Sequence, residues 1–346
     1  MWGTITETTP AAPGTHRRVA CTDRCRPSDS SKTGPAPRVH HRGMPVDLAA
    51  ATAFMTGHAR LLDRRRFAVR LLDARADGAL AALHAYRNPD GGYGSLEPDL
   101  RSPESQPVAA LHAFEVLEDV GPVTTPRATE LCDWLASVTL PDGGLPFALP
   151  VADPVATAPF WAQADPATSS LHMSAAVAAA AHRVAGHDPA VARHPWLATV
   201  TGYCLGAIER QGGPSSTLEL RYALDLLDAV AGARPDAAGL LARWAGALPA
   251  SATLPVEGGA DDEVIRPLDF SPRPGRPVRD HIDARVVDED LDRLADEQRD
   301  DGGWAVDFVS WSPAAALEWR GYATVRAVTT LAAHGRVPPR VASPSG

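Results

Sequence analysis

The sequence has 346 residues, of which 45% are hydrophobic, 22% are charged and four are cysteines, and its formal net charge is −9. This length and hydrophobic content predict a globular chain with a large core, and four scattered cysteines exclude a disulfide scaffold. No apolar run is long enough for a membrane span and no signal-peptide pattern is present, so we expect a cytoplasmic protein.

Residues 1–43 differ in composition from the rest of the chain. They are rich in Pro, Ser and Arg, show no periodicity and hold seven Lys or Arg against three Asp or Glu. We predict a disordered tail, with a start at Met44 as an alternative that would leave this tail out of the native protein. The remaining residues hold 26 Lys or Arg against 39 Asp or Glu. Such an acidic body excludes nucleic acid and anionic membranes as expected partners.

Two of the cysteines lie in this tail. Cys21 and Cys25, with His40 and His41 nearby, could be drawn as a metal site. We do not adopt this interpretation, and we expect neither a metal ion nor another cofactor. The sequence gives no signal for an oligomeric state.

Apolar residues recur at helical spacing through most of residues 44–340, beginning with a helix predicted over 46–77. Pairs of helices follow. The first members, polar on one face, are predicted at 77–87, 126–138, 194–209, 236–248 and 284–298. The second members, apolar nearly all round, are predicted at 105–121, 167–186, 215–232 and 312–335. Because a helix of the second kind must be covered on both sides, we expect the second members to form an inner layer.

Capping residues mark several helix ends. Asp165-Pro166 and Ser312-Pro313 each place a capping side chain before a proline that suits the first helical position. Glycines expected to be left-handed C-terminal residues follow four helices: Gly121, Gly186, Gly232 and Gly335.

An Asp-Gly-Gly turn occurs three times, at 90–92, 142–144 and 301–303, between a first and a second member. Glycine lets the chain reverse where a side chain would clash, and the aspartate can accept hydrogen bonds from turn amides. The spacing of the first two turns allows about six hairpins in the chain. We therefore predict an all-α fold: one domain over residues 44–340, in which about six helical hairpins close into a double ring, an α/α-toroid.

The third turn lies in "QRDDGGW", where Gln298, Gly302 and Trp304 occupy the Gln-x-x-x-Gly-x-Trp positions of the repeat in squalene-hopene cyclases and related terpenoid cyclases. The other two turns keep only the glycine, as Gly91 and Gly143. The Ser/Thr and Ala-Leu pattern of the second members is similar to that of protein prenyltransferase β subunits. The resemblance covers about residues 77–335 and implies the α/α-toroid fold of both families.

The catalytic signatures of these families do not carry over. The Asp-x-Asp-Asp acid of the cyclases is replaced by "GADD" at 259–262, and the diphosphate-metal motif fails at 261–265. The zinc-binding Asp-x-Cys of the prenyltransferases is absent, because Cys132 is followed directly by Asp133. The resemblance therefore implies a divergent member.

Loops that lead into the second members are expected to cross the end of the ring, around the mouth of a central cavity. The segment 255–283 is predicted to be a long ordered loop over this mouth, because its prolines forbid a continuous helix. The candidate catalytic acids are Glu104, Asp165 and Glu318. The candidate ligand-binding residues are Trp161, His172, Arg221, Arg320 and Tyr322.

Structural alternatives stay open for these residues. Asp165 can be a helix N-cap, and His172 a hydrogen-bonded core residue. Glu318 and Arg320 can form ion pairs across the ring. If Glu318 and Tyr322 face inward, Arg320 must lie between the helix layers and needs an acid such as Asp307. If Arg320 faces inward instead, it becomes an anion-binding residue and Glu318 a buried structural partner.

Three functions are compatible with the sequence. The leading hypothesis is a divergent prenyltransferase- or terpene cyclase-like protein that binds an isoprenoid or another apolar small molecule in the central cavity, with its reaction undefined. One alternative is a carbohydrate-active α/α-barrel enzyme, in which paired carboxylates and tryptophans grip a sugar. The other is a non-catalytic binding or scaffold protein on the same fold.

Overall fold

The computed structural model describes residues 46–337, so the predicted tail lies outside the described part of the chain. The chain divides into two units, Met1–His41 and Arg42–Gly346, and all described residues belong to the second. They form fourteen α-helices, two short 3-10 helices and two two-residue strands, β1 (Leu254–Pro255) and β2 (Val264–Ile265). The predicted all-α class is confirmed, apart from the antiparallel pairing of β1 with β2.

The predicted helix pairs are present. The first members are α3 (Asp77–His84), α5 (Pro126–Val138), α9 (Pro195–Gln211), α11 (Pro235–Ala245) and α13 (Ala284–Asp296). The second members are α4 (Pro107–Asp119), α7 (Leu171–Ala185), α10 (Thr217–Val230) and α14 (Pro313–Ala333). Short helices lie in the connections: α6 (Pro159–Ala162), α8 (Pro189–Ala192), α12 (Pro267–Phe270), η1 (Pro154–Ala156) and η2 (Pro277–His281).

The predicted helix over 46–77 is in fact two helices, α1 (Leu48–His58) and α2 (Leu61–Leu71). Ala59 and Arg60 between them have extended backbones. At this break α14 approaches closely, since a Cβ added to Gly321 would lie 3.0 Å from the Ala59 Cβ. The break therefore depends on a tertiary contact, which local periodicity does not report.

Serine caps fix the starts of three second members. The side chains of Ser170, Ser216 and Ser312 accept hydrogen bonds from the backbone amides three residues later. The expected start at Asp165-Pro166 is wrong, because α7 begins only at Leu171. Among the four glycines expected to be left-handed, Gly121 and Gly335 have positive φ. Gly186 and Gly232 do not, and Gly186 has a φ of −60°.

The three Asp-Gly-Gly turns share one geometry. In each, the aspartate accepts a hydrogen bond from the amide of the second glycine. The first glycine has a φ of +88° to +93°. A Cβ added to the second glycine of each turn would lie only 2.5–2.8 Å from the nearest atoms of a neighbouring segment. On Gly303, for example, the nearest atoms are those of the Phe54 ring. The prediction that glycine is required there is confirmed.

The segment around the third turn also contacts the start of the described chain. Gln298 donates to the carbonyl of Asp47 and accepts from its amide, each at 2.8 Å. Asp47 is the N-cap of α1. Trp304 Nε1 donates to the Leu294 carbonyl of α13 at 2.7 Å. The glutamine and tryptophan of the motif therefore hold α13 next to α1.

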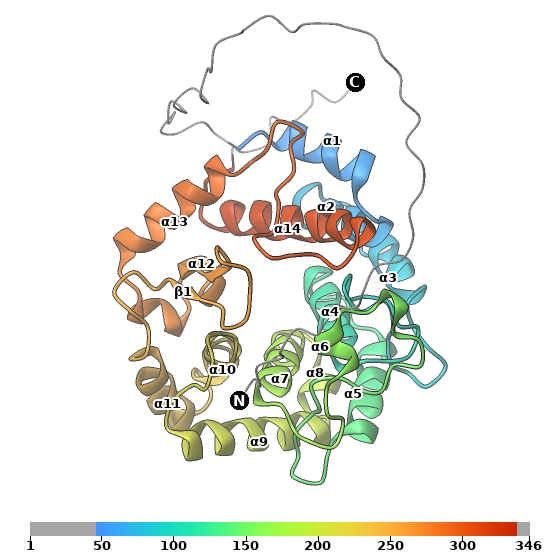
Figure 1. Ribbon diagram of the computed structural model, residues 1–346, viewed down its shortest axis with the longest axis vertical. Helices are drawn as coiled ribbons and strands as arrows, with labels where there is room; N and C mark the ends of the chain where they lie inside the picture. Colours follow the sequence, from blue (N-terminus) through green and yellow to red (C-terminus); the bar gives the residue numbers. More distant parts are fainter. Residues whose placement is uncertain (1–45, 338–346) are drawn as a thin grey trace, which may run out of the picture. The chain divides into compact units, whose positions relative to one another are not determined.

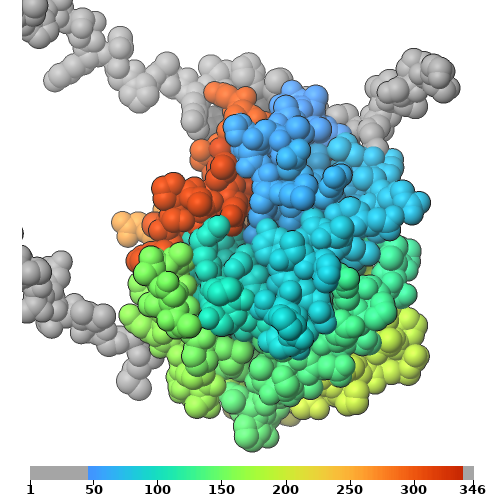
Figure 2. All heavy atoms as spheres, turned by 90° about the vertical axis from the view of Figure 1, so that its right-hand side faces the viewer, coloured from blue at the N-terminus to red at the C-terminus, as the bar shows by residue number. Residues whose placement is uncertain are grey.

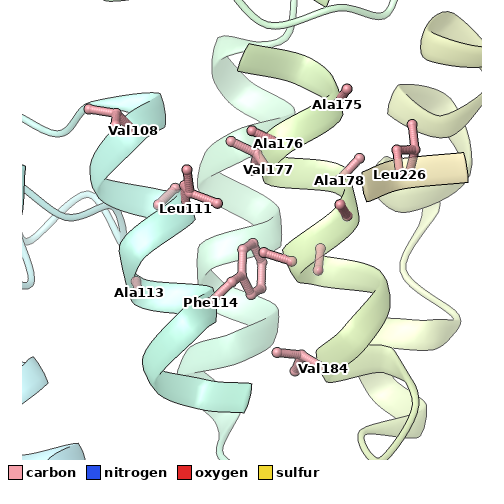
Figure 3. Close-up of a cluster of buried hydrophobic side chains, with 14 of the residues drawn as sticks. Val108, Leu111, Ala113, Phe114, Ala175, Ala176, Val177, Ala178, Val184 and Leu226 are labelled. Carbon is pink, nitrogen blue, oxygen red and sulfur yellow. The ribbon is translucent and has the colours of Figure 1, made fainter. Parts of the chain in front are cut away.

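Among the described helices, α7 has the largest number of buried residues, and it packs against α4, α9 and α10. Residues 175–181, six of them alanine, each expose at most 1% of their surface. Figure 3 shows Val108, Leu111 and Phe114 of α4 beside the alanine-rich side of α7, with Leu226 of α10 beyond it. Burial on both sides is what its apolar pattern predicted. The small side chains allow the neighbouring helices to approach closely.

Segments distant in sequence lie together at the chain ends and in the loops. Figure 1 shows α14 beside α1 and α2, with which it packs. Figure 2 shows the cyan segment before α4 against the green segment before α7, where Leu100 forms an isolated bridge with Thr157. No helix within residues 46–337 is long and apolar enough to cross a membrane.

Candidate functional site

Four aromatic side chains form a continuous column. Trp161 of α6 stacks on Phe147 of the preceding loop, with ring centroids 4.5 Å apart and an interplanar angle of 9°. His172, in the first turn of α7, contacts Phe147 at 5.6 Å and stacks on Tyr222 of α10 at 4.7 Å. We call these four residues the aromatic column. Trp161 is buried and the other three are half-buried, so part of the column is accessible.

Arg221 lies at the Tyr222 end of the aromatic column. Its guanidinium is 4.8 Å from the centre of the Tyr222 ring, a cation–π distance. It has no hydrogen bond or ion pair to any other residue in the described part of the chain. Burial disfavours its charge, but the Tyr222 hydroxyl and Asp269 raise the pKa of Arg221 above its ordinary value. Arg221 is therefore a permanent, half-buried cation with unused hydrogen-bond donors.

Two members of the aromatic column also lack polar partners. Burial, and then the charge of Arg221, lower the pKa of His172 to about 4, so its ring is neutral near pH 7. Neither ring nitrogen of His172 has a hydrogen-bond partner in residues 46–337. The indole N–H of Trp161 is buried without an acceptor. The column and Arg221 together present donors that the described protein atoms do not satisfy.

Three of the predicted ligand-binding residues thus come together: Trp161, His172 and Arg221. Phe147 and Tyr222, which complete the column, were not predicted from the sequence. Phe147 follows the second Asp-Gly-Gly turn by three residues, and Tyr222 follows Arg221 directly. Both are aromatic residues beside predicted candidates, and this proximity is the signal that could have identified them.

A second cluster surrounds His112 of α4, which is buried between two carboxylates. His112 Nε2 lies 2.9 Å from Glu97 Oε2, and Nδ1 lies 3.1 Å from Glu115 Oε2. The Tyr322 hydroxyl of α14 donates to Glu115 at 2.8 Å, and Arg66 Nη2 of α2 is 3.7 Å from the same carboxylate. We call these five residues the His112 network. It joins α2, α4, α14 and the loop before α4.

The His112 network is a set of compensating charges. Burial alone would lower the pKa of His112, but hydrogen bonds to Glu115 and Glu97 raise it to about 9. Burial would raise the pKa of Glu115, yet His112 and Arg66 hold it well below its usual range. Glu115 is therefore ionised and His112 protonated at neutral pH. A carboxylate held in this way is a poor proton donor.

Tyr322, another predicted ligand-binding residue, lies in the His112 network rather than in the aromatic column. The Arg66 guanidinium is 5.4 Å from the centre of its ring, and the Trp319 ring is 5.5 Å away. The ring contacts of Tyr322 therefore lie within and beside the His112 network.

The three predicted catalytic acids are separate from each other. Glu318 is half-buried and forms ion pairs with Arg101 at 2.9 Å and Arg60 at 3.8 Å. Glu104 accepts a hydrogen bond from the Ser102 hydroxyl in its own loop.

Asp165 is exposed and accepts hydrogen bonds from the Ala167 amide at 3.0 Å and the Thr168 hydroxyl at 2.6 Å. The Thr168 hydroxyl, with the Ala167 amide, lowers the pKa of Asp165. Asp165 thus caps a loop turn rather than a helix. Within residues 46–337, no hydrogen bond or ion pair joins Glu104, Asp165 or Glu318 to the aromatic column.

Arg320 is held by an acid and an aromatic ring of other segments. Its Nη2 contacts both carboxylate oxygens of Asp301, at 2.7 and 2.8 Å, and its guanidinium lies 4.5 Å from the centre of the Phe54 ring. The expected acid partner is present, but it is Asp301 rather than the suggested Asp307, which pairs with Arg266. Arg320 therefore ties α14 to the third turn and to α1.

No group of His, Cys, Asp and Glu in the described residues is arranged to hold a metal ion. Cys132 and Cys204 are free and buried. Burial raises the pKa of the Cys132 thiol to about 12 and raises that of Cys204 as well. Neither thiol is suited to act as a nucleophile near neutral pH.

Comparison with known proteins gives little about function. No protein-family model and no curated protein matches the sequence. A solved structure of a protein from Actinoplanes is similar with a TM-score of 0.44 and 16% sequence identity, covering 82% of this chain and 99% of that one.

Proposed function

We propose that the chain is a divergent α/α-toroid protein, related to terpenoid cyclases and protein prenyltransferases, that binds an isoprenoid or another elongated apolar molecule along the aromatic column. The helix predicted over 46–77 is divided into α1 and α2. These two helices supply a hairpin that was not predicted, and this supports the expected number of about six hairpins. The order in which the helices pack against each other supports a closed ring. It runs from α2 through α4, α7, α10, α12 and α13 to α14, which packs back on α2.

The observation that carries the proposed binding is the aromatic column itself. Its four rings come from the loop after α5, from α6, α7 and α10, and three of them keep accessible surface. Large aromatic rings gain most from covering that surface with an apolar ligand. A column that continues over four rings matches an elongated molecule better than a compact one.

The ion pairs and hydrogen bonds of the candidate acids favour a binding function over a catalytic one. Glu318 is paired with arginines, and Glu104 and Asp165 hold local turns. Glu115 is kept ionised by the His112 network. A carbohydrate-active enzyme needs a raised-pKa acid beside a second carboxylate, and these residues do not supply it.

The test is the binding of farnesol, an isoprenoid alcohol, measured by tryptophan fluorescence and calorimetry. We expect the wild-type protein to bind it, and Tyr222→Ala to weaken binding about tenfold through lost contact area. Tyr203→Ala is the matched control, since Tyr203 of α9 is half-buried outside the column. Equal binding by both variants, or no binding by the wild-type protein, would refute the proposed function.

A further inference from the structure

Arg221 differs from the other arginines on the surrounding second-member helices. Arg183 of α7 pairs with Glu118 at 2.9 Å and with Asp225 at 2.8 Å. Arg326 of α14 pairs with Asp269 at 2.6 Å. The two carboxylates that help to raise the pKa of Arg221, Asp269 and Asp225, are thus already paired with other arginines. Arg221 is left with a positive charge that no described carboxylate contacts.

The position of Arg221 leaves its donors available. The central carbon of the guanidinium lies over the Tyr222 ring, at 4.8 Å from the ring centre. A cation–π contact of this kind positions the group without using its N–H donors. Those donors form a planar fork that matches the two oxygens of a carboxylate. The site can therefore receive an anion without first breaking an ion pair.

The surroundings limit the charge that Arg221 can receive. Arg183 and Arg326 are engaged with Asp225 and Asp269, so Arg221 supplies one unpaired positive charge beside the column. A second negative charge on a ligand would find no other unpaired arginine on the described second-member helices. A single negative charge is what the site accommodates.

We infer that Arg221 binds the head group of a monoanionic amphiphile, a long-chain carboxylate, whose apolar body lies along the aromatic column. The apolar part of this inference rests on the proposed function. The head group is specified independently by Arg221. An alcohol would leave the guanidinium without its ion pair, and a diphosphate would bring more negative charge than Arg221 alone can neutralise.

The experiment compares three probes of equal chain length: dodecanoate, dodecanol and dodecyl phosphate, the last at a pH where it is a dianion. Calorimetric affinities are measured at low salt for the wild-type protein, Arg221→Met, Arg221→Lys and Arg285→Met. Arg285 is an exposed arginine of α13 and serves as the matched control. Arg221 has no ion pair to lose, so both Arg221 variants should keep the wild-type melting temperature.

We expect dodecanoate to bind the wild-type protein about tenfold or more tightly than dodecanol, and more tightly than dodecyl phosphate. Arg221→Met should reduce dodecanoate binding to the level of dodecanol, Arg221→Lys should retain part of the difference, and Arg285→Met should change nothing. If dodecanol binds as well as dodecanoate, or Arg221→Met leaves the preference intact, the inference fails while the proposed function stands. A preference for dodecyl phosphate would overturn the single-charge assignment. If no probe binds, both fail.

Discussion

At the scale of single residues, the acids within reach of an arginine decide whether it stabilises the fold or is free to bind a ligand. Arg320 and Arg221 both stack on an aromatic ring, yet Arg320 is fixed by Asp301 and Arg221 by no acid. The sequence could place Arg221 among the candidates, because the Ser216 cap and the apolar period locate α10 closely. It could not show that Arg221 is unpaired. That depends on Arg183 and Arg326 reaching the nearby carboxylates from other helices.

The His112 network predicts a specific pH dependence of stability. His112 has a folded-state pKa of about 9, raised above the ordinary unfolded value near 6.5. A raised pKa stabilises the folded state when the group is protonated in both states. The stabilisation is therefore complete below about pH 6.5 and is lost as the pH rises through about 9. We expect the free energy of unfolding to fall by roughly 3 kcal/mol across this window.

Chemical denaturation at about pH 6 and about pH 9.5 measures this effect. His112→Gln should be less stable at the lower pH and should lose most of the pH dependence over this window. His281→Gln is the control, because His281 is exposed. If His112→Gln keeps the wild-type loss of stability between the two pH values, His112 does not carry the charge that its contacts imply.

At the scale of elements, the segment 255–283 contacts both ends of α10. Near its start, Glu257 accepts hydrogen bonds from Thr217 at the beginning of α10. Further along, Arg276 and the Val278 amide bind Asp228 near the end of α10. The segment therefore runs along α10 and includes the short helix α12. It takes the place of a second-member helix, as its prolines and its apolar residues together implied.

The part from 271 to 282 is anchored mainly by arginines. Arg273 pairs with Glu118 of α4, and Arg276 pairs with Asp228 of α10 at 2.8 Å. Arg279 donates to the Ser271 carbonyl and lies 3.2 Å from His334 Nε2. Of residues 272–280, only Val278 is buried. Ionic contacts of this kind weaken when salt screens them.

Hydrogen exchange tests this anchoring. We expect Arg276→Met at low salt, and the wild-type protein in about 1 M NaCl, to exchange amides of 271–282 about tenfold faster. Exchange in α7 should be unchanged, and Arg285→Met should match the wild-type protein. Unaltered exchange in 271–282 would mean that Val278 and Ile282 hold the segment by apolar packing alone.

Helices were easier to predict than the breaks between them. The range of α5 was predicted without error, because Thr125 caps it before Pro126 and its apolar period is regular. The α1–α2 break was missed because it depends on the close approach of Gly321. The start of α7 was placed too early because Asp165-Pro166 has the composition of a cap. In the structure this pair forms a separate turn stabilised by Thr168.

At the scale of the whole described chain, the repeat was the strongest signal in the sequence. The three Asp-Gly-Gly turns have one geometry, and Gln298 connects the last of them to the N-cap of α1. The candidate site was less predictable, because it lies where different repeats meet. Phe147, His172 and Tyr222 belong to three separate segments, and their ring contacts depend on how α7 and α10 pack.

Photo-crosslinking tests most directly whether an amphiphile lies along the aromatic column. Dodecanoate that carries a diazirine in its chain is bound, irradiated and located by mass spectrometry of the digested protein. We predict that cross-links fall on peptides containing Phe147, His172 or Tyr222, and that excess dodecanoate suppresses them. Cross-links confined to the exposed apolar residues Val155 and Val309, which expose 85% and 81% of their surface, would contradict the account.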